Sequence, residues 1–465
     1  MNAASMPAAA RLGSFIAGRA GKQLSSSVAD KAGVHLLDAL GVGLLGAAEP
    51  TAMAAASIAL DVPAGSGTAR LWSAGRSAPA TDAIVANAVA VHAQFHDDSE
   101  HSSWSHPGSF VVPVAISGAD ALEESLEMVM RAVTAGYAAV AWIGAHERVA
   151  RAMIGRGVRT SPTLGTVAAA ATGAVLLRLD AQQATHAVAM AASMTGGTLE
   201  PVRCGSDEWR LQNANAAVGG WRCAQLAARG VRGARFAFEG PKGLASAMAG
   251  LIEMPPEWLE EPDGDAILHS YVKPFATLGD NMAAARAAKL LHAQGIDADS
   301  IERVTVGIWE PYTKYPGTSH RGPFETPVQA LASTVFAVAT LLIYGELEYD
   351  KASDHREDPR ILELVRKIEI VAAEDATHLD ASVSIQTRDG RHRQSRASEA
   401  PVTWLYPTPE TATATFLERL RASGHDTAAT RQMAADVFGT LDRRQAMAVR
   451  RWLDALGPSP TERTS

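Results

Sequence analysis

The sequence predicts a mainly α protein in which both chain ends build one large all-helical domain, with a smaller α+β domain inserted between them. Alanine-rich segments with apolar residues three and four apart, a spacing typical of amphipathic helices, dominate as far as about Met254. After Pro255 the chain becomes rich in proline and acidic residues, and short segments alternate in polarity as half-buried strands do. Helical spacing returns from Thr408. The expected domains are a helical domain of residues 1–258 and 400–465 and an α+β domain of residues 259–399.

Four segments of the first part have the clearest helical patterns. Apolar side chains recur at helical spacing in residues 26–46, 161–179, 180–196 and 213–230. We expect Asp180 to be the N-cap of the third helix, because its carboxylate can accept a hydrogen bond from a free backbone N–H group. Alanine and glycine are so frequent in these segments that the helices should pack closely, without bulky side chains between them.

The inserted part contains predicted strands and helices in alternation. Polarity alternates, as it does in half-buried strands, in residues 301–309, 367–374 and 381–396. The last of these segments contains Asp389-Gly390, a strong signal for a β-hairpin turn. Helical spacing marks two further segments, 280–295 and 326–345. The chain then returns to helical patterns at 409–424, 426–442 and 443–457, and we expect the tail 458–465 to be disordered.

Composition excludes several functional classes. The 465 residues carry a formal net charge of −8, which argues against a nucleic-acid backbone as partner. Neither the number nor the spacing of Cys204 and Cys223 supports a disulfide framework or a structural zinc site, so we expect a reducing, cytoplasmic location. We expect no signal peptide, no membrane span and no phosphate-binding loop, because no segment has the corresponding pattern.

Residues 90–113 and the helix end before them gather titratable side chains between two apolar segments. The histidines are His92, His96, His101 and His106, and the last of them opens a His-Pro-Gly turn. Polar groups between buried elements are costly unless they are solvated, paired or functional, and histidine titrates near neutrality without a special environment. The segment is therefore either a functional site or a hydrated loop with capping carboxylates. His92 ends an apolar helix, and we interpret it as a structural histidine.

An ordered series of matches resembles the MmgE/PrpD family, which includes 2-methylcitrate dehydratase, cis-aconitate decarboxylase and iminodisuccinate epimerase. The matching pieces include NAVAVHAQFHDDS with HPGSFVVPVAI, GYAAVAWIG, SPTLGTVAAAATGAVLLRLDAQQATHAVAMAAS, FEGPKGLASA, VKPFATLGDNMAAARAA and IERVTVGI. The resemblance implies an all-helical domain joined to a smaller α+β lid domain, in a homodimer. It also implies an active site between the two domains that acts on small di- and tricarboxylates without a metal or an organic cofactor.

The loop of the resembled family is only partly preserved. It usually reads Asp-Phe-Asp-Asp-Thr, followed after a short spacer by His-Pro. This chain has Phe95 in place of the first aspartate, and it continues through His96, Asp97 and Asp98 to Ser99 in place of the threonine. The His-Pro pair is retained at residues 106–107.

Other positions of the resembled family are also altered. Arg159 stands where a second histidine is usual, and Trp209 stands where a lysine is usual. Lys273 matches the lysine of the lid domain. The histidine that usually follows this lysine corresponds to Met282 or to its neighbour Asn281. These replacements imply a substrate unlike the citrate-type acids, because a guanidinium stays protonated and an indole makes a pocket smaller and more apolar.

Dehydration, decarboxylation and epimerisation share one step, the formation of a carbanion or enolate next to a carboxylate. That step needs a base, a proton donor and cations that hold the carboxylates. By the resemblance and by their chemistry we expect His106, Asp97, Asp98 and Lys273 to be catalytic, with His106 as base or acid and an aspartate orienting it. The expected substrate-binding residues are Ser99, Arg159, Ser161, Trp209 and Arg210. Arg203 and Arg321 are further candidate carboxylate clamps.

The sequence therefore predicts a cofactor-independent lyase that acts on a small carboxylic acid other than 2-methylcitrate. Proton abstraction next to a carboxylate would lead to dehydration or decarboxylation. Two alternatives stay open at this point: an isomerase or epimerase of a carboxylate, and a family member that has lost catalysis and binds a metabolite. The interpretation implies a small-molecule carboxylate partner and no metal, nucleic acid or membrane.

Overall fold

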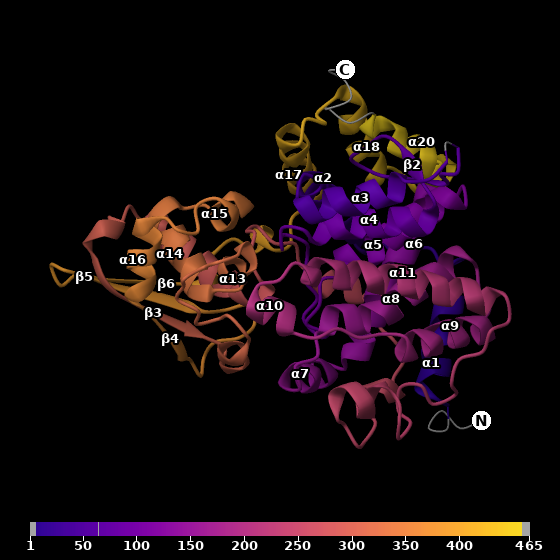
Figure 1. Cartoon of the computed structure of the whole chain (residues 1–465), viewed down its shortest axis with the longest axis horizontal. Coiled ribbons are helices and arrows are strands. Elements are labelled where there is room, and N and C mark those ends of the chain that lie inside the picture. The colour runs from indigo at the N-terminus through magenta and orange to yellow at the C-terminus, as the bar shows by residue number, and fades with distance from the viewer. Residues whose placement is uncertain (1–5, 64, 458–465) are drawn as a thin grey trace.

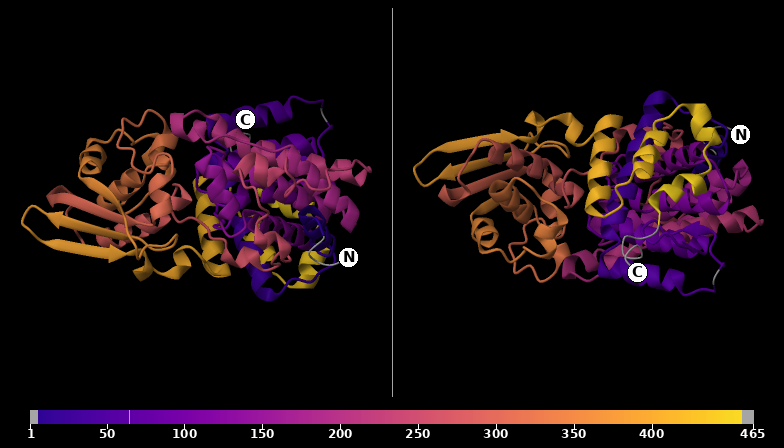
Figure 2. Two further views of the ribbon diagram at one scale, coloured as in Figure 1. Left: turned by 90° about the horizontal axis from the view of Figure 1, so that it is seen from below. Right: turned by 90° about the horizontal axis from the view of Figure 1, so that it is seen from above.

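The computed structural model describes residues 6–63 and 65–457, and it confirms the mainly α fold class. A large body of packed helices lies beside a smaller body that contains the sheet, and the separation is visible from three directions (Figures 1 and 2). Each body has its own hydrophobic core. The core of the large body draws on residues between 8 and 267 and between 416 and 456, so both ends of the described chain contribute to it.

Most of the chain before residue 230 is helical. A two-stranded hairpin, β1 (Ala69–Arg70) and β2 (Ser77–Ala78), interrupts it early and was not among the predicted elements. The helices are α1 (Ala8–Ala17), α2 (Ser26–Gly46), α3 (Pro50–Leu60), α4 (Ala80–His92), α5 (Val111–Ala121), α6 (Leu126–Gly144), α7 (Arg148–Gly155), α8 (Thr160–Leu176), α9 (Ala181–Ser193), α10 (Glu200–Cys204) and α11 (Glu208–Ala228).

The centre of this domain is α8, which is buried along its whole length and packs against α6 and α11. Small residues are necessary at this contact, since a Cβ atom on Gly220 of α11 would lie 2.4 Å from the carbonyl oxygen of Thr166. The predicted N-cap of α9 is present: the Asp180 carboxylate accepts from the Gln183 backbone N–H at 2.8 Å, and the Gln183 side chain accepts from the Asp180 N–H in return.

The C-terminal helices return to the helical domain (Figure 1), where α17 packs against α2, α19 against α6 and α20 against α5. They are α17 (Pro409–Ala422), α18 (Ala428–Val437), α19 (Leu441–Ala446) and α20 (Val449–Leu453). A buried ion pair joins α17 to α2, with Arg419 Nη1 2.7 Å from Asp38 Oδ1. Residues 458–465, where we predicted disorder, lie outside the described residues.

The smaller domain, called the lid domain below, is built on a four-stranded sheet in the order β4-β3-β5-β6. Its strands are β3 (Ile301–Ile308), β4 (Ile368–Ala372), β5 (Ser382–Thr387) and β6 (His392–Arg396), and all three predicted strand segments are confirmed. The β3–β4 pair is parallel and the other two pairs are antiparallel. Gly390 has a φ of +80° in the turn of the β5–β6 hairpin, as its turn signal predicts. The helices are α12 (Met282–Ala293), α13 (Pro327–Leu331), α14 (Thr334–Tyr344), α15 (Tyr349–Ser353) and α16 (Pro359–Arg366).

One segment predicted as a single helix, residues 326–345, is broken between α13 and α14. The Ser333 hydroxyl accepts a hydrogen bond from the Phe336 backbone N–H and starts α14 as its N-cap. The break leaves the Leu331 carbonyl free to accept from the Thr277 hydroxyl at 2.6 Å and from the Leu278 N–H at 3.2 Å. It therefore fixes the segment that leads into α12, and this segment forms part of the site described below.

The predicted helix at 443–457 is broken as well. Met447 has an extended backbone, and its carbonyl accepts from the Leu126 N–H while the Val449 N–H donates to the Glu124 carbonyl. The turn before α6 thus satisfies the backbone groups that the break exposes. Helix α6 itself has 19 residues and a mean hydropathy of 1.2, enough for a membrane span, but 89 % of that window is buried inside the protein, as in a core helix.

Candidate active site

The titratable segment forms a loop between α4 and α5, and Asp98 holds it in place. The Asp98 carboxylate lies 2.6 Å from His35 Nδ1 and accepts hydrogen bonds from the Gly108 N–H at 2.7 Å and from the Tyr137 hydroxyl. A Cβ atom at Gly108 would lie 2.9 Å from Asp98 Oδ1, so the His-Pro-Gly turn needs its glycine. Both carboxylate oxygens face the protein, and this geometry gives Asp98 a positioning role beneath the loop.

His106 presents a basic nitrogen from this loop. Its Nδ1 lies 2.8 Å from the Asp98 carbonyl oxygen, which can only accept, so Nδ1 carries the proton and Nε2 carries the lone pair. Burial, together with the positive charge of Lys273, lowers the pKa of His106 well below 6.5. The imidazole is therefore neutral at physiological pH, as a general base must be before it accepts a proton.

A small cavity of about 30 Å³ opens beside His106 at the junction of the two domains. The helical domain contributes Ser99, whose hydroxyl lies 3.3 Å from His106 Nδ1, and the lid domain contributes Tyr271. Ser99 and Tyr271 also exchange two backbone hydrogen bonds of 2.9 and 3.0 Å, which join the loop to the lid domain. The full lining is Ser99, Glu100, His101, Trp104, Ser105, His106, Tyr271, Leu278, Gly279, Asp280, Tyr312 and Tyr315.

Asp280 is the acidic group of the lid domain in this cavity, and the sequence patterns did not identify it. Burial raises its pKa to about 7, although the charge of Lys273 and a backbone hydrogen bond oppose the rise. Its Oδ2 is buried and has no hydrogen-bond partner among the described residues. Burial also raises the pKa values of Tyr312 and Tyr315, which stay neutral hydroxyl groups. The one feature of the sequence that could have pointed to Asp280 is its position seven residues after Lys273.

Lys273 lies between the loop and the lid domain. Its ammonium donates a hydrogen bond of 2.9 Å to the Phe95 carbonyl and lies 5.4 Å from the centre of the Phe95 ring. Burial lowers the pKa of Lys273 to about 8, although Asp97, Asp98 and other carboxylates favour its charged form. Its positive charge helps to lower the pKa of His106 and opposes the rise in the pKa of Asp280, although Lys273 is not among the residues that line the His106 cavity.

Comparison with known proteins is consistent with this two-domain arrangement. The MmgE/PrpD N-terminal domain matches residues 10–255 and the MmgE/PrpD C-terminal domain matches residues 276–413. The chain belongs to the MmgE/PrpD family. A relative in Aspergillus oryzae, named "Cis-aconitate decarboxylase-like protein oryM", is 26 % identical over 363 residues, which cover 72 % of this chain and 73 % of the relative.

The altered family positions form an aromatic wall beside His106. Phe95 and Trp209 are fully buried, with ring centres 4.3 Å apart, and the Phe95 ring lies 5.7 Å from the His106 ring. These side chains occupy the positions where an aspartate and a lysine are usual in the MmgE/PrpD family. Both rings are buried beside His106, and neither is among the residues that line the cavity.

Arg159 and Asp97 are bridged through His92, behind the aromatic wall. Arg159 Nη2 lies 2.7 Å from His92 Nε2, and His92 Nδ1 lies 2.8 Å from Asp97 Oδ2. Arg159 also donates to the Trp209 carbonyl at 2.6 Å. Because a guanidinium can only donate, His92 accepts at Nε2 and donates from Nδ1 to Asp97. Arg159 thus donates its hydrogen bonds to other residues of the protein. It is not among the residues that line the cavity, so the structure does not place it there as a substrate clamp.

The remaining predicted residues of the MmgE/PrpD site lie away from the cavity. Ser161 is buried in the first turn of α8. Arg210 donates to the Ala93 carbonyl and to the Tyr349 hydroxyl, and so links the helical domain to the lid domain. Arg203 pairs with Glu200 at the surface, and Arg321 donates to the Ile368 carbonyl inside the lid domain. Asn281 bonds to Thr277, and Met282 starts α12 inside the lid core, so neither replaces the family histidine.

Proposed function

We propose that this protein is a cofactor-independent lyase that acts on a small carboxylic acid in the cavity between His106 and Asp280. The observation that carries the proposal is the pairing of two complementary groups in one closed cavity. The neutral His106 has a free Nε2 lone pair, and Asp280 is a carboxyl group that is protonated up to about neutral pH. Enzymes that move protons at neutral pH need such a base and such an acid together.

The two groups can carry out an elimination without a cofactor. His106 Nε2 removes the proton from the carbon next to the substrate carboxylate, and the electron pair delocalises into that carboxylate. The positive charge of Lys273 stabilises the enolate that forms. Asp280 then donates its proton to the departing hydroxide, so that water leaves and a carbon–carbon double bond remains.

The same residues can serve a decarboxylation, which the printed name of the Aspergillus relative favours. In that case the bond between carbon and the carboxylate breaks, carbon dioxide leaves, and the electron pair stays on carbon. Asp280 protonates that carbon and regains a proton from water after the product leaves, while the neutral His106 accepts hydrogen bonds at Nε2. We propose a less charged acid than 2-methylcitrate as substrate, because Phe95 and Trp209 place aromatic surface where family members usually have charged groups.

The closed cavity is too small for such a substrate. About 30 Å³ holds roughly two water molecules, whereas a carboxylic acid of several carbons needs a larger space. We propose that the lid domain moves away to admit the substrate and closes over it to exclude water. The Ser99–Tyr271 backbone bridge is the contact that would have to open.

His106→Ala tests this proposal directly. The purified protein is assayed with cis-aconitate and with mono- and dicarboxylic acids, and both carbon dioxide release and double-bond formation are followed. On the acid that the wild type converts, His106→Ala should reduce kcat by about two orders of magnitude or more, the usual scale for a general base. Full turnover by a folded His106→Ala variant would contradict the assignment. Ser161→Ala, which changes a buried residue outside the cavity, is the matched control and should keep its kcat.

A further inference from the structure

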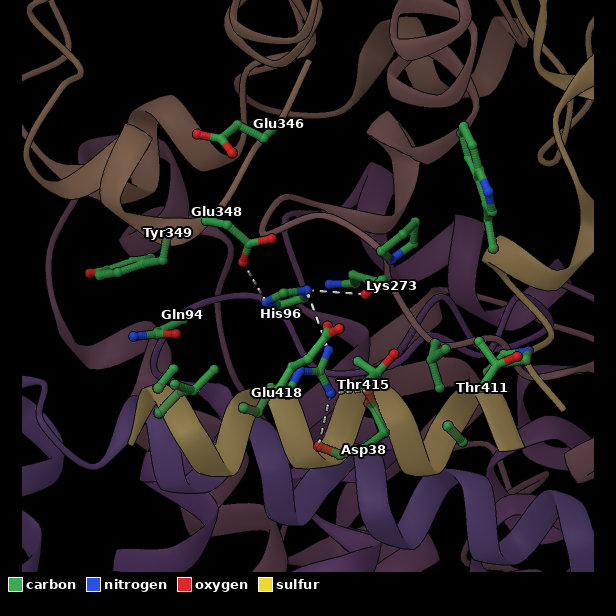
Figure 3. A pocket seen from close by; sticks show the side chains of 18 of the residues that line it. Asp38, Gln94, His96, Lys273, Glu346, Glu348, Tyr349, Thr411, Thr415 and Glu418 are labelled. Carbon is green, nitrogen blue, oxygen red and sulfur yellow. Dashed lines mark hydrogen bonds and ion pairs between the residues drawn. The ribbon is translucent and has the colours of Figure 1, made fainter. Parts of the chain in front are cut away.

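A second and much larger cavity, which Lys273 helps to line, lies between the helical domain and the lid domain. Its volume is about 930 Å³, and we call it the α17 cavity. Asp38 of α2 and Arg419 of α17 line it from the helical domain, and Glu348 and Trp404 line it from the lid domain. Figure 3 shows these two sides facing each other, with α17 as the floor. The volume is within the range of small-molecule sites.

The lining carries more negative than positive charge. The carboxylates are Asp38, Glu346, Glu348, Asp350 and Glu418, and the cations are Lys273, Lys289 and Arg419. Each cation already has a partner. Arg419 pairs with Asp38 at 2.7 Å, Lys273 donates to the Phe95 carbonyl, and Lys289 lies over the Trp404 ring at 5.2 Å. With five carboxylates against three cations, the lining has an excess of negative charge, which favours a cationic ligand.

Two of the carboxylates are available to a ligand. The Glu348 side chain is 60 % exposed, and its carboxylate lies 4.0 Å from His96 Nδ1, too far for a hydrogen bond. Glu418 projects into the same space from α17 and makes no hydrogen bond or ion pair among the described residues. These two carboxylates come from different domains, and each can accept hydrogen bonds from a ligand in the cavity.

His96 adds a buried acceptor that faces the same space. His96 is only 5 % exposed, and its Nε2 atom lies 3.1 Å from the Lys273 carbonyl oxygen. Arg419 Nη2 also lies 3.5 Å from Nε2, but the Lys273 carbonyl is the nearer partner and can only accept. Nε2 therefore carries the proton, and Nδ1 carries a lone pair that faces Glu348. Figure 3 shows this ring between the Lys273 carbonyl and Glu348. A buried nitrogen lone pair beside a carboxylate is a site for an N–H donor.

We propose that the α17 cavity binds a small organic ammonium ion. Its N–H groups donate to the Glu348 carboxylate and to His96 Nδ1, and its carbon chain packs beside the rings of Tyr349 and Trp404. A second ammonium group on the same molecule reaches the Glu418 side of the cavity. The bound cation bridges the lid domain and α17, so it holds the two domains together. This site is separate from the His106 cavity and does not depend on the proposed reaction.

Calorimetric titration with 1,4-diaminobutane tests the proposal without any measurement of turnover. Succinate, a dianion with the same number of carbons, is the ligand control. We expect saturable binding of the diamine with a Kd of about 1 mM or below and no saturable heat with succinate. Glu348→Gln should weaken diamine binding roughly tenfold or more. Because this side chain is largely exposed, the variant should fold, and circular dichroism checks that it does.

Glu302→Gln is the matched control variant, because Glu302 is an exposed carboxylate on β3 outside the cavity. It should bind the diamine as the wild type does. Three outcomes overturn the proposal: no saturable heat with the diamine, equal binding of succinate, or equal weakening in Glu302→Gln and Glu348→Gln. The last of these would show that the diamine is attracted only by the overall negative charge of the surface.

Discussion

At the scale of single residues, one hydrogen bond decides what His106 can do. The Asp98 carbonyl fixes the proton on Nδ1, and burial beside Lys273 keeps the ring neutral, so the Nε2 lone pair is available. Asp280 has the opposite state, because burial raises its pKa to about 7. A histidine with a lowered pKa and a carboxyl group with a raised pKa form a base and an acid suited to catalysis at neutral pH.

Asp280→Asn tests the acid of this pair. An acid catalyst must be protonated, so the kcat of the wild type should fall as the pH rises through about 7, where Asp280 loses its proton. A base catalyst must be unprotonated, and because the pKa of His106 is lowered, kcat should fall on the acid side only below pH 6.5. We expect Asp280→Asn to reduce kcat by about two orders of magnitude and to remove the decline near pH 7. A pH profile of kcat for both proteins makes the measurement, and an unchanged decline would assign it to another group.

The same substitution should stabilise the fold at alkaline pH. The pKa of Asp280 rises from 3.8 to about 7 on folding, so the folded state holds the proton more tightly than the unfolded state. Its contribution to stability is full below pH 3.8 and is lost as the pH rises through about 7. Asp280→Asn should therefore raise the Tm more at pH 8 than at pH 5, as measured by thermal unfolding. A decrease of Tm at pH 8 would show that the ionised carboxylate has a stabilising partner.

The sequence predicted part of this residue arrangement. His106 lines the small cavity, whereas Lys273, which was expected beside it, affects the pKa of His106 but lines the larger cavity next to α17. Asp280, Tyr312 and Tyr315 were missed because they come from lid segments that only tertiary folding brings to the loop. The partners of Arg159 were missed for the same reason, since no sequence pattern shows that a buried histidine and a backbone carbonyl will take its donors.

At the scale of elements, spacing predicted which segments are helices and strands, and tertiary contacts decided where they break. The apolar pattern of residues 26–46 matches α2 in full, because a long buried helix leaves a continuous signal. The breaks before α14 and after α19 depend on hydrogen bonds from distant segments, such as those that Thr277 and Leu126 make. Such contacts leave no trace in local spacing.

Arg419→Ala tests the contact between α17 and α2. Arg419 and Asp38 are both buried, so removal of the guanidinium leaves a carboxylate without its partner in a poorly solvated place. We expect the free energy of unfolding to fall by about 3–5 kcal/mol, measured by denaturant titration. Arg421→Ala on the same helix removes an arginine side chain that is 65 % exposed, and it should change stability by about 0.5 kcal/mol or less. Equal effects of the two variants would contradict a special role for the buried pair.

At the scale of the whole molecule, both cavities are lined by residues from the two domains. The His106 cavity has walls from the loop after α4 and from the lid segment around Asp280, and Arg210 adds a link to Tyr349 of the lid domain. A family member of this kind can change its substrate without changing its fold, because the residues that line the cavities between the two domains come from a few loops. The helical core, with its close contacts through small residues, stays the same.

The substrate range follows from the apolar wall of this enclosure. A tricarboxylate carries several charges that need cations or hydrogen-bond donors, whereas Phe95 and Trp209 put buried aromatic rings beside His106 and Arg159 is bound to His92 and to the Trp209 carbonyl. Burial of an unpaired carboxylate against such a wall is costly. We therefore expect 2-methylcitrate and citrate to be converted poorly, with kcat/KM below about 10⁴ M⁻¹s⁻¹, and a less charged acid to be converted better. Steady-state assays of these acids side by side make the measurement. Conversion of 2-methylcitrate above that value would mean that the wall moves aside or that charged groups replace it when the lid domain closes on substrate.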